Sequence, residues 1–325
     1  VHEANQLYSQ GKYEESKVIW EQVIEKSNYY TLALVNIGNI LMREEENDAA
    51  IEYFYEAENA LYASEAFEEI RADFLREHFS TIIIVVVVLL IAWVVWVSVK
   101  RARRRKYGPP KERHNVFTVI RNFFRRITGI MRHPIDGFEG IRYENQGSYA
   151  DMVIIMILYA LISVVSEYAV SFIYRDGTPL DVIEPVSTFF FAFLPWIVVC
   201  VVNYGVTTIM YGEGRFRDVI IGGAYCHGPL LLLMLPINLL THILTQNEAG
   251  IFKIVNILLY FWTVLLVYFC IKGVHGFHPV KAFVVSILTV LGVAAVAILF
   301  FIVFGLAVQM FDFLIQFGKE LSYLV

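Results

Sequence analysis

The spacing of hydrophobic residues divides the chain into two parts. Over residues 1–78 apolar positions recur every three or four residues between charged ones, which predicts amphipathic helices. Residues 79–99 then form 21 positions without a charge, the length that a helix needs to cross a bilayer. Further apolar runs lie at about 149–173, 188–211, 219–244, 251–273 and 280–308. The sequence therefore predicts an all-α protein, with a short helical-repeat domain before a polytopic helical membrane domain of about six spans.

A repeat of 34 residues runs through the N-terminal part. Displacement by 34 positions places side chains of similar size on one another: Leu7 on Leu41, Ser16 on Ala50, Trp20 on Phe54 and Val23 on Ala57. This period, with a helix–turn–helix corner at Gly11 and Tyr13, resembles the tetratricopeptide repeat over about residues 3–60. Glu45 and Asn47 replace the Gly and Tyr of that repeat at the second corner, and no Pro closes either repeat.

Stacked helix pairs of this kind leave a concave face that accepts peptides or partner helices. We therefore expect the domain at 1–78 to bind a protein outside the membrane. The residues predicted to contact this partner are Leu7, Tyr8, Tyr13, Trp20, Leu41 and Phe54. The alternative is that the repeats are only a spacer or a packing platform.

Charge is separated along the chain, although the net charge is only −5. Residues 1–78 carry −11, residues 100–133 carry +11 and residues 134–325 carry −5. A basic cluster directly after a span stays on the cytoplasmic side, so the first span at 79–99 is predicted to place the acidic domain outside. An exported domain requires a signal peptide or an extra span, and we expect one before Val1. With a mean hydropathy of +0.57, this pattern argues against a single soluble globular domain.

Residues 100–148 are predicted to form a basic cytoplasmic linker that contains an amphipathic helix. Within 115–133, an apolar stripe from Val116 to Ile130 lies opposite several arginines. The residues expected at an anionic membrane surface are Arg101, Arg103, Arg104, Arg105, Arg121, Arg125 and Arg132. The alternative is a docking element for a cytosolic partner. Nucleic acid is not expected as a partner, because no base-reading motif accompanies these charges. Residues 309–325 are predicted to form an amphipathic C-terminal tail.

Four polar side chains are predicted to lie within the spans: Glu167, Asn203, Asn238 and Asn256. Glu167 would pair with a neighbouring helix or lie at the outer interface, and the asparagines would form hydrogen bonds between helices. The three cysteines lie inside apolar runs without metal-ligand spacing. We found no nucleotide-binding, hydrolase or metalloprotease motif. The sequence therefore predicts no catalytic residue, no metal site, no cofactor and no enzyme activity.

Three segments carry a second resemblance. HPIDGFEGIRYENQGSYADM at 133–152, YGEGRFRDVIIGGAYCHGPLLLLMLP at 211–236 and GVHGFHPVKAFVVSILTVL at 273–291 resemble, in this order, motifs of bacterial members of the Yip family of membrane proteins. The resemblance covers about 133–315, and so includes the five-span domain at 149–308. It implies a helical membrane domain without established chemistry that acts as an assembly partner. The Rab-linked acid-Leu-Tyr-Gly-Pro motif of eukaryotic relatives is absent, so a Rab partner is not implied.

Together these patterns predict a non-enzymatic accessory or scaffold subunit in a bacterial cytoplasmic membrane. Bacterial relatives with repeat-bearing N-termini resemble proteins encoded beside carbohydrate ABC transporters. The expected partners are therefore membrane lipids, membrane proteins such as ABC transporter permease subunits, and an extracytoplasmic protein bound by the repeats. Two alternatives stay open: an autonomous small-solute transporter or channel, and an envelope scaffold or lipid-organising protein.

Overall fold

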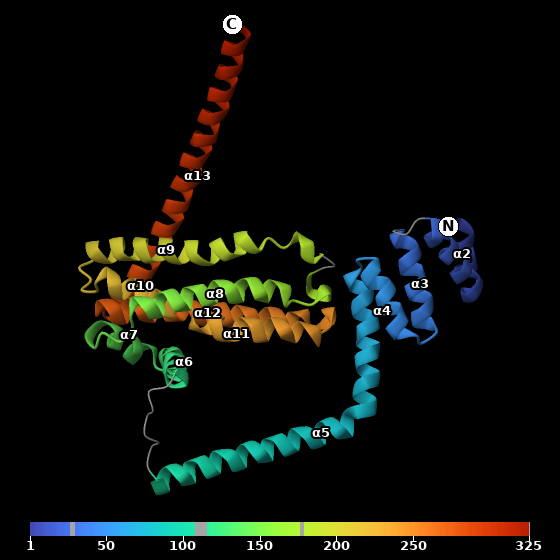
Figure 1. Cartoon of the computed structure of the whole chain (residues 1–325), viewed down its shortest axis with the longest axis horizontal. Helices are drawn as coiled ribbons and strands as arrows, with labels where there is room; N and C mark the ends of the chain where they lie inside the picture. Colours follow the sequence, from blue (N-terminus) through green and yellow to red (C-terminus); the bar gives the residue numbers. More distant parts are fainter. Residues whose placement is uncertain (27–29, 108–115, 176–178, 325) are drawn as a thin grey trace. The chain divides into compact units, whose positions relative to one another are not determined.

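The computed structural model describes residues 1–26, 30–107, 116–175 and 179–324 (Figure 1). Within these ranges the side chains of 103–107, 116–118, 182 and 317–324 are not described. The described residues form helices, turns and loops without a strand, which confirms the all-α prediction.

Contacts divide the chain into two compact units. Unit 1 comprises residues 1–122, 165–184 and 235–257, and unit 2 comprises residues 123–164, 185–234 and 258–325. The described helices that contribute residues to both units are α6 (Val116–Arg132), α8 (Tyr149–Tyr168), α11 (Gly228–Leu239) and α12 (Ala249–His275).

Unit 1 begins with two helix hairpins, α1 (His2–Ser9) with α2 (Tyr13–Lys26) and α3 (Thr31–Arg43) with α4 (Asn47–Glu56), followed by α5 (Ala60–Tyr107). Successive helices pack against each other. We call residues 1–78 the helical module. Its fully buried centre combines Trp20, Ile37 and Phe54 with small residues. Gly38 is required there, because a Cβ atom would lie 2.5 Å from the ring of Phe54. Large and small side chains thus interlock in the core of the module.

The two hairpin corners share one backbone geometry at an offset of 34 residues. Lys12 N donates to Leu7 O at 3.0 Å, and Glu46 N donates to Leu41 O at 2.9 Å. Gly11 has φ +78° at the first corner, and Glu45 has φ +62° at the second. The left-handed region is costly for a residue with a Cβ atom. The second corner therefore adopts the left-handed conformation at Glu45, although glycine is the residue that favours it.

Four short 3₁₀ segments complete unit 1. They are η1 (Phe172–Arg175), η2 (Leu180–Val182), η3 (Leu240–His242) and η4 (Gln246–Glu248). They lie in the connections from α8 to α9 (Pro185–Ile209) and from α11 to α12.

Unit 2 contains α6 (Val116–Arg132, from residue 123), α7 (Pro134–Tyr143), α9, α10 (Phe216–Tyr225) and α13 (Pro279–Leu324), with parts of α8, α11 and α12. Its core includes the fully buried Phe138, Ile141 and Tyr225. Helices α9 and α13 pack along one another. Glycine at position 273 allows α7 to pack closely against α12, because a Cβ atom there would lie 2.9 Å from Cβ of Phe138.

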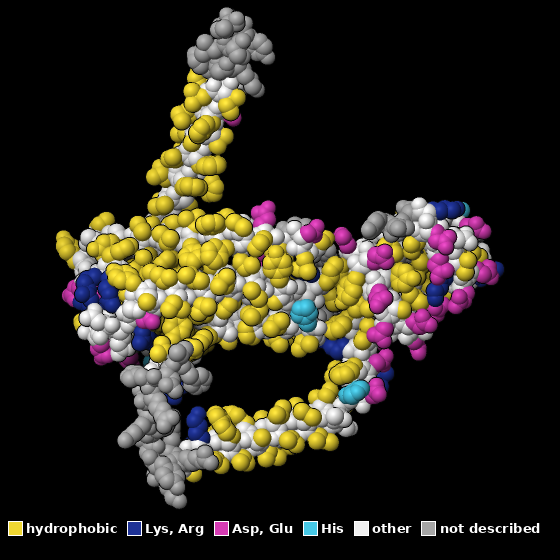
Figure 2. All heavy atoms as spheres, in the orientation of Figure 1, with side chains coloured by type: hydrophobic (Ala, Val, Ile, Leu, Met, Phe, Trp, Pro, Cys, Tyr) yellow, Lys and Arg dark blue, Asp and Glu magenta, His cyan; other side chains and the backbone are white. Residues whose placement is uncertain are grey.

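Among the described residues, the helical segments long and apolar enough to cross a membrane number six: Ala60–Ala102, Tyr149–Tyr168, Pro185–Ile209, Phe216–His242, Gln246–His275 and Pro279–Gln316. The predicted number of spans is confirmed. Figure 2 shows hydrophobic side chains over the visible face of these helices and acidic side chains on the helical module. The fourth segment is interrupted at residues 226–227, between α10 and α11. None of the apolar window in α5 is buried by protein.

Two helix boundaries and the packing of one helix differ from the prediction. Residues 100–107 continue α5 instead of forming a linker, and residues 309–324 continue α13 instead of forming a separate tail. The C-terminal half of α6 is not a free interfacial helix, because Ile127 and Ile130 are buried in the core of unit 2. Without a proline or glycine stop after each apolar run, helical backbone continues into the polar residues.

Replacement of Glu45 by Gly is expected to stabilise the helical module by about 1 kcal/mol, because it removes the Cβ atom from a left-handed position. Urea-dependent pulse proteolysis of the full-length protein in detergent measures this change. The matched control is Glu45→Ala, because it removes the same side chain but keeps the Cβ atom at the left-handed position. Equal effects of the two substitutions would contradict the assignment of strain to residue 45.

Candidate functional site

The helical module is bound to two inter-span connections within unit 1. Arg71 of α5 donates to both carboxylate oxygens of Glu248, at 2.7 and 3.2 Å, and to Ile243 O at 2.7 Å. Both charged side chains are mostly buried, 25% and 31% exposed. A two-point contact between a guanidinium and a carboxylate fixes orientation as well as distance. We call this contact the Arg71 clamp.

Further hydrogen bonds hold the connection that carries η4. Gln246 N donates to Ser64 Oγ at 2.8 Å, and the Asn247 amide donates to Glu68 at 2.8 Å. Glu248 also accepts the N–H of Thr245 at 2.9 Å. The module therefore satisfies polar groups at the start of a membrane-spanning segment, where unpaired groups would be costly.

Apolar contacts hold the connection that carries η1. Ile173 is buried in the same cluster as the module core. The ring of Phe172 meets that of Tyr55 edge to face at 5.0 Å. Tyr174 packs on Phe252 at 5.1 Å and donates its hydroxyl to Thr245 O at 2.8 Å. The core of the module therefore extends onto the η1 connection, while the η4 connection is held by hydrogen bonds.

The residues predicted to bind a partner separate into two groups. Trp20, Leu41 and Phe54 are buried at 0%, 3% and 0% exposure, so they hold the module together and offer no surface to a partner. This corrects their predicted role, because the aromatic and large positions of the repeat face the helix–helix core. Leu7, Tyr8 and Tyr13 are partly exposed.

Tyr8 and Tyr13 form an accessible cluster with Arg43. The Arg43 guanidinium donates to both phenol oxygens, at 3.1 and 3.2 Å, and lies 5.6 and 5.1 Å from the two ring centres. The hydrogen bond to Tyr8 is the main reason that the pKa of Arg43 is raised. We call these three residues the tyrosine–arginine patch. Such a group offers aromatic faces and a cation, the residue types that interfaces favour.

A second polar site lies in unit 2, around the loop between α9 and α10. Asp218 is buried and accepts hydrogen bonds from Arg215 at 2.9 Å and Arg217 at 3.1 Å. Arg217 also donates to Gly147 O at 2.7 Å and to Asn145 Oδ1 at 3.2 Å. These contacts fasten the segment before α8 to the segment before α10.

The same loop contacts the ends of α7 and α12. Arg142 forms an ion pair with Glu213, and Gly214 N donates to His275 Nδ1 at 3.2 Å. A Cβ atom on Gly214 would lie 2.8 Å from that nitrogen, so glycine permits the approach. The three motif segments at 133–152, 211–236 and 273–291 therefore meet at one place in unit 2.

Arg126 is a site residue that the sequence analysis did not identify. It donates to Asp151 at 2.6 Å and to the Tyr225 hydroxyl at 3.3 Å. Burial alone would lower the pKa of Arg126, but the bond to Tyr225 and the charge of Asp151 outweigh this effect and raise it. Arg126 lies on the apolar face of α6, because it follows Phe123 by three residues and precedes Ile130 by four. This position distinguishes it in the sequence from the solvent-facing arginines.

The other predicted basic residues do not form one site in the described structure. Arg101, Arg121, Arg125 and Arg132 are exposed, as a membrane-surface role requires. Arg103, Arg104 and Arg105 lie outside the described side chains. Contact with lipid stays a prediction for all of them.

The intramembrane asparagines differ in their partners. Asn203 of α9 donates to Thr289 of α13 at 3.0 Å, and Asn238 of α11 donates to Ser166 O of α8 at 3.0 Å. These two bonds confirm the predicted links between helices. For Asn256 the prediction is wrong, because its amide donates to Phe252 O one turn earlier in its own helix. Glu167 is partly buried near the end of α8.

The fold and the three converging motif segments define a multi-pass helical membrane protein. The family model of the Yip1 domain matches residues 128–314, which is more than half of the chain. The chain therefore belongs to the Yip1 domain family, and the predicted extent of about 133–315 agrees with this match. No curated protein and no solved structure matches the chain.

Loss of the Arg71 clamp is expected to loosen the module from the η4 connection. Arg71→Ala removes one partner of a largely buried ion pair, which costs about 1–2 kcal/mol, equivalent to roughly tenfold faster local opening. Hydrogen exchange at the amide of Gln246 measures this opening. Arg76→Ala is the matched control on the same helix, because the Arg76 side chain is 79% exposed and pairs with Asp73 of the same helix. Equal exchange in both variants would show that the clamp does not hold the module.

Proposed function

We propose that the protein is a non-enzymatic accessory or scaffold subunit of a membrane assembly and acts through protein–protein contacts. The supporting observation is that the module shares a core with the η1 connection and hydrogen-bonds the η4 connection, while the tyrosine–arginine patch stays accessible. A protein bound to that patch would be held at a fixed place beside the ends of membrane spans. The membrane domain itself belongs to the Yip1 domain family.

The proposed module is tetratricopeptide-repeat-like. Its support is the 34-residue offset, which relates both the side-chain sizes and the corner hydrogen bonds of the two hairpins. With two hairpins the available surface is small. A short segment or one helix of a partner fits it better than a large globular face.

The apolar windows of α5 and α13 give the proposed assembly a second contact. They are 0% and 6% buried in this chain. Hydrocarbon chains or the spans of a partner such as an ABC transporter permease would cover them. The carbohydrate ABC transporter is the specific partner that we propose, on the resemblance of repeat-bearing bacterial relatives alone.

We further propose that the module lies outside a bacterial cytoplasmic membrane and that residues 100–148 lie in the cytoplasm. The charge difference between −11 before the first span and +11 after it supports this orientation. The exposed arginines of α6 would then face the anionic cytoplasmic leaflet.

An autonomous transporter is supported less well. Glu167, Asn203 and the broken fourth helix are the candidates to line its path. The Asn203 amide donates to Thr289 of another helix, so this residue has a structural partner in the described protein.

Affinity purification tests the assembly. A tagged full-length protein extracted from native membranes is expected to retain permease subunits, and Tyr13→Ala with Arg43→Ala is expected to reduce their recovery about tenfold or more. The matched control is Val18→Ala, because Val18 is 51% exposed on the same module. Recovery of no membrane-protein partner by the wild type would reject the proposal. Equal recovery by the double variant would reject the patch as the contact.

Trypsin accessibility tests the orientation separately. The module contains cleavage sites at Lys12 and Lys26, and the basic segment begins at Lys100. Trypsin added to intact spheroplasts is expected to remove an N-terminal epitope and to leave the basic segment uncut. In inverted vesicles the expected result is the reverse, and cleavage of the basic segment in intact spheroplasts would overturn the orientation.

A further inference from the structure

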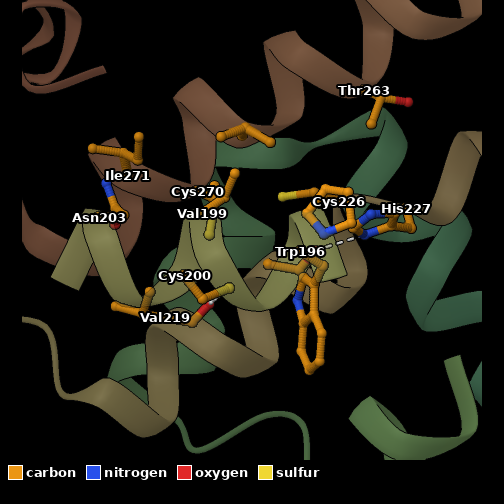
Figure 3. Close-up of a pocket in the computed structure, with 13 residues that line it drawn as sticks. Trp196, Val199, Cys200, Asn203, Val219, Cys226, His227, Thr263, Cys270 and Ile271 are labelled. Atoms are coloured by element: carbon orange, nitrogen blue, oxygen red, sulfur yellow. Dashed lines mark hydrogen bonds between the residues drawn. The ribbon is translucent and has the colours of Figure 1, made fainter. Parts of the chain in front are cut away.

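A cavity of about 150 Å³ lies among the spans of unit 2, and Figure 3 shows the side chains on its wall. The His227 ring nitrogen Nδ1 lies 3.0 Å from Gly223 O, and Cys226 Sγ donates to Gly222 O at 3.2 Å. These hydrogen bonds satisfy the backbone at the interruption of the fourth span and do not define a ligand. A surface that is open to its surroundings lies in unit 1 instead.

One face of α5 is covered by protein as far as Arg71 and is exposed after it. Ser64 and Arg71 of this face bond to the η4 connection. Each residue of a helix advances by about 100°, so Phe74, Leu75 and His78 continue the same face one and two turns later. Phe74 and Leu75 are 54% and 44% exposed. The protein therefore covers the polar part of this face and leaves its apolar continuation accessible.

The turns after the clamp separate apolar from charged side chains. The rings of Phe74 and His78 stack with their centres 4.6 Å apart. On the opposite side Asp73 and Arg76 form an ion pair at 2.9 Å, and both side chains are more than half exposed. Glu77 is also on the charged side and is 80% exposed. A helix with one apolar and one charged side is typical of a segment that lies in a membrane interface.

The Arg71 clamp places these turns at the level where membrane spans end. Arg71 donates to Ile243 O at 2.7 Å, and Ile243 lies between the spans Phe216–His242 and Gln246–His275. The uncharged run of α5 itself begins at Phe79. The turns between the clamp and this run therefore lie at the border of the hydrocarbon layer, and they are too short to extend far from it.

Exposed apolar surfaces adjoin this face on two sides. Leu239, Leu240 and Ile243, at the end of the fourth span, are 51%, 46% and 57% exposed. The apolar window of α5 that follows is 0% buried. Hydrocarbon chains cover such surfaces in a membrane, and the face of residues 74–79 is continuous with both. Its occupant is therefore phospholipid. The charged side carries one arginine against two acids, so an anionic headgroup is not specifically favoured.

We propose that residues 73–79 of α5 lie in the membrane–water interface, where Phe74 and Leu75 insert among the acyl chains of phospholipids. The charged side chains on the opposite side stay in water. The Arg71 clamp, one turn earlier, holds the apolar face at this depth. The helical module thereby rests on the bilayer itself. This contact is independent of the tyrosine–arginine patch, of any protein partner and of the side of the membrane on which the module lies.

Photo-cross-linking of the full-length protein in phosphatidylcholine vesicles tests this contact. Benzoylphenylalanine replaces residue 75 in one variant and residue 73 or 18 in two controls, and mass spectrometry identifies what it attaches after irradiation. The probe at residue 75 is expected to attach phospholipid about fivefold more than either control. Asp73 is the control for direction, because it lies on the charged side of the same turn. Val18 is the control for exposure, because it is 51% exposed on α2.

A probe at residue 89 shows that the reaction works, because Leu89 is 63% exposed within the apolar window of α5. With phospholipid attached at residue 89, its absence at residue 75 would overturn the proposal. Equal attachment at residues 73 and 75 would show a helix without a lipid-facing side and also overturn it. Attachment of residue 75 mainly to a second copy of the chain would identify a protein interface, with the same consequence.

The role of the clamp is tested with the probe kept at residue 75. Arg71→Ala is expected to lower phospholipid attachment about threefold or more, because the direction of the apolar face is then no longer fixed. Arg76→Ala is the matched control and is expected to leave attachment unchanged, because Arg76 is on the charged side. Equal attachment in these two variants would overturn the role of the clamp in holding the face at its depth.

Discussion

The bilayer requires that the protein satisfy its own backbone polar groups, and this constraint governs the whole membrane domain. It explains why every described span is helical and why departures from the helix carry their own hydrogen bonds. At the interruption of the fourth span, the Cys226 thiol donates a hydrogen bond to the carbonyl of Gly222, and the His227 ring donates one to the carbonyl of Gly223. At the start of the fifth span, Glu248 accepts the N–H of Thr245 and Ser64 accepts that of Gln246. The helical module thus contributes to the same requirement from outside the spans.

The contact between the module and the inter-span connections combines two kinds of interaction. The Arg71 clamp and its neighbouring hydrogen bonds define direction, and the loss of the clamp costs only about 1–2 kcal/mol. Ile173 contributes more through burial, because it is almost fully removed from water. Polar contacts therefore determine the orientation of the module on the connections, and apolar contacts supply most of the free energy that holds the two together.

Hydrophobic periodicity predicted the helical class, the number of spans and the large-and-small pattern of the repeat, because these follow from local burial. The sequence also predicted that the side-chain amides of Asn203 and Asn238 form hydrogen bonds between helices, since polar groups in spans need partners. The partner of Arg71 was not predictable, because Glu248 is 177 residues away and many acids compete for one arginine. Trp20 and Phe54 show a related difficulty. Periodicity identifies the side of a helix that is covered, but it does not distinguish the module's own core from a partner.

Arg71 also separates two parts of α5. Helical backbone continues from Ala60 to Tyr107, but Figure 1 shows that α5 bends sharply along its length. The clamp fixes the first part of this helix on the η4 connection. The direction of the apolar window that carries Trp93 and Trp96 depends on the bend as well, so the bend is the element that passes a movement of the module on to the first span.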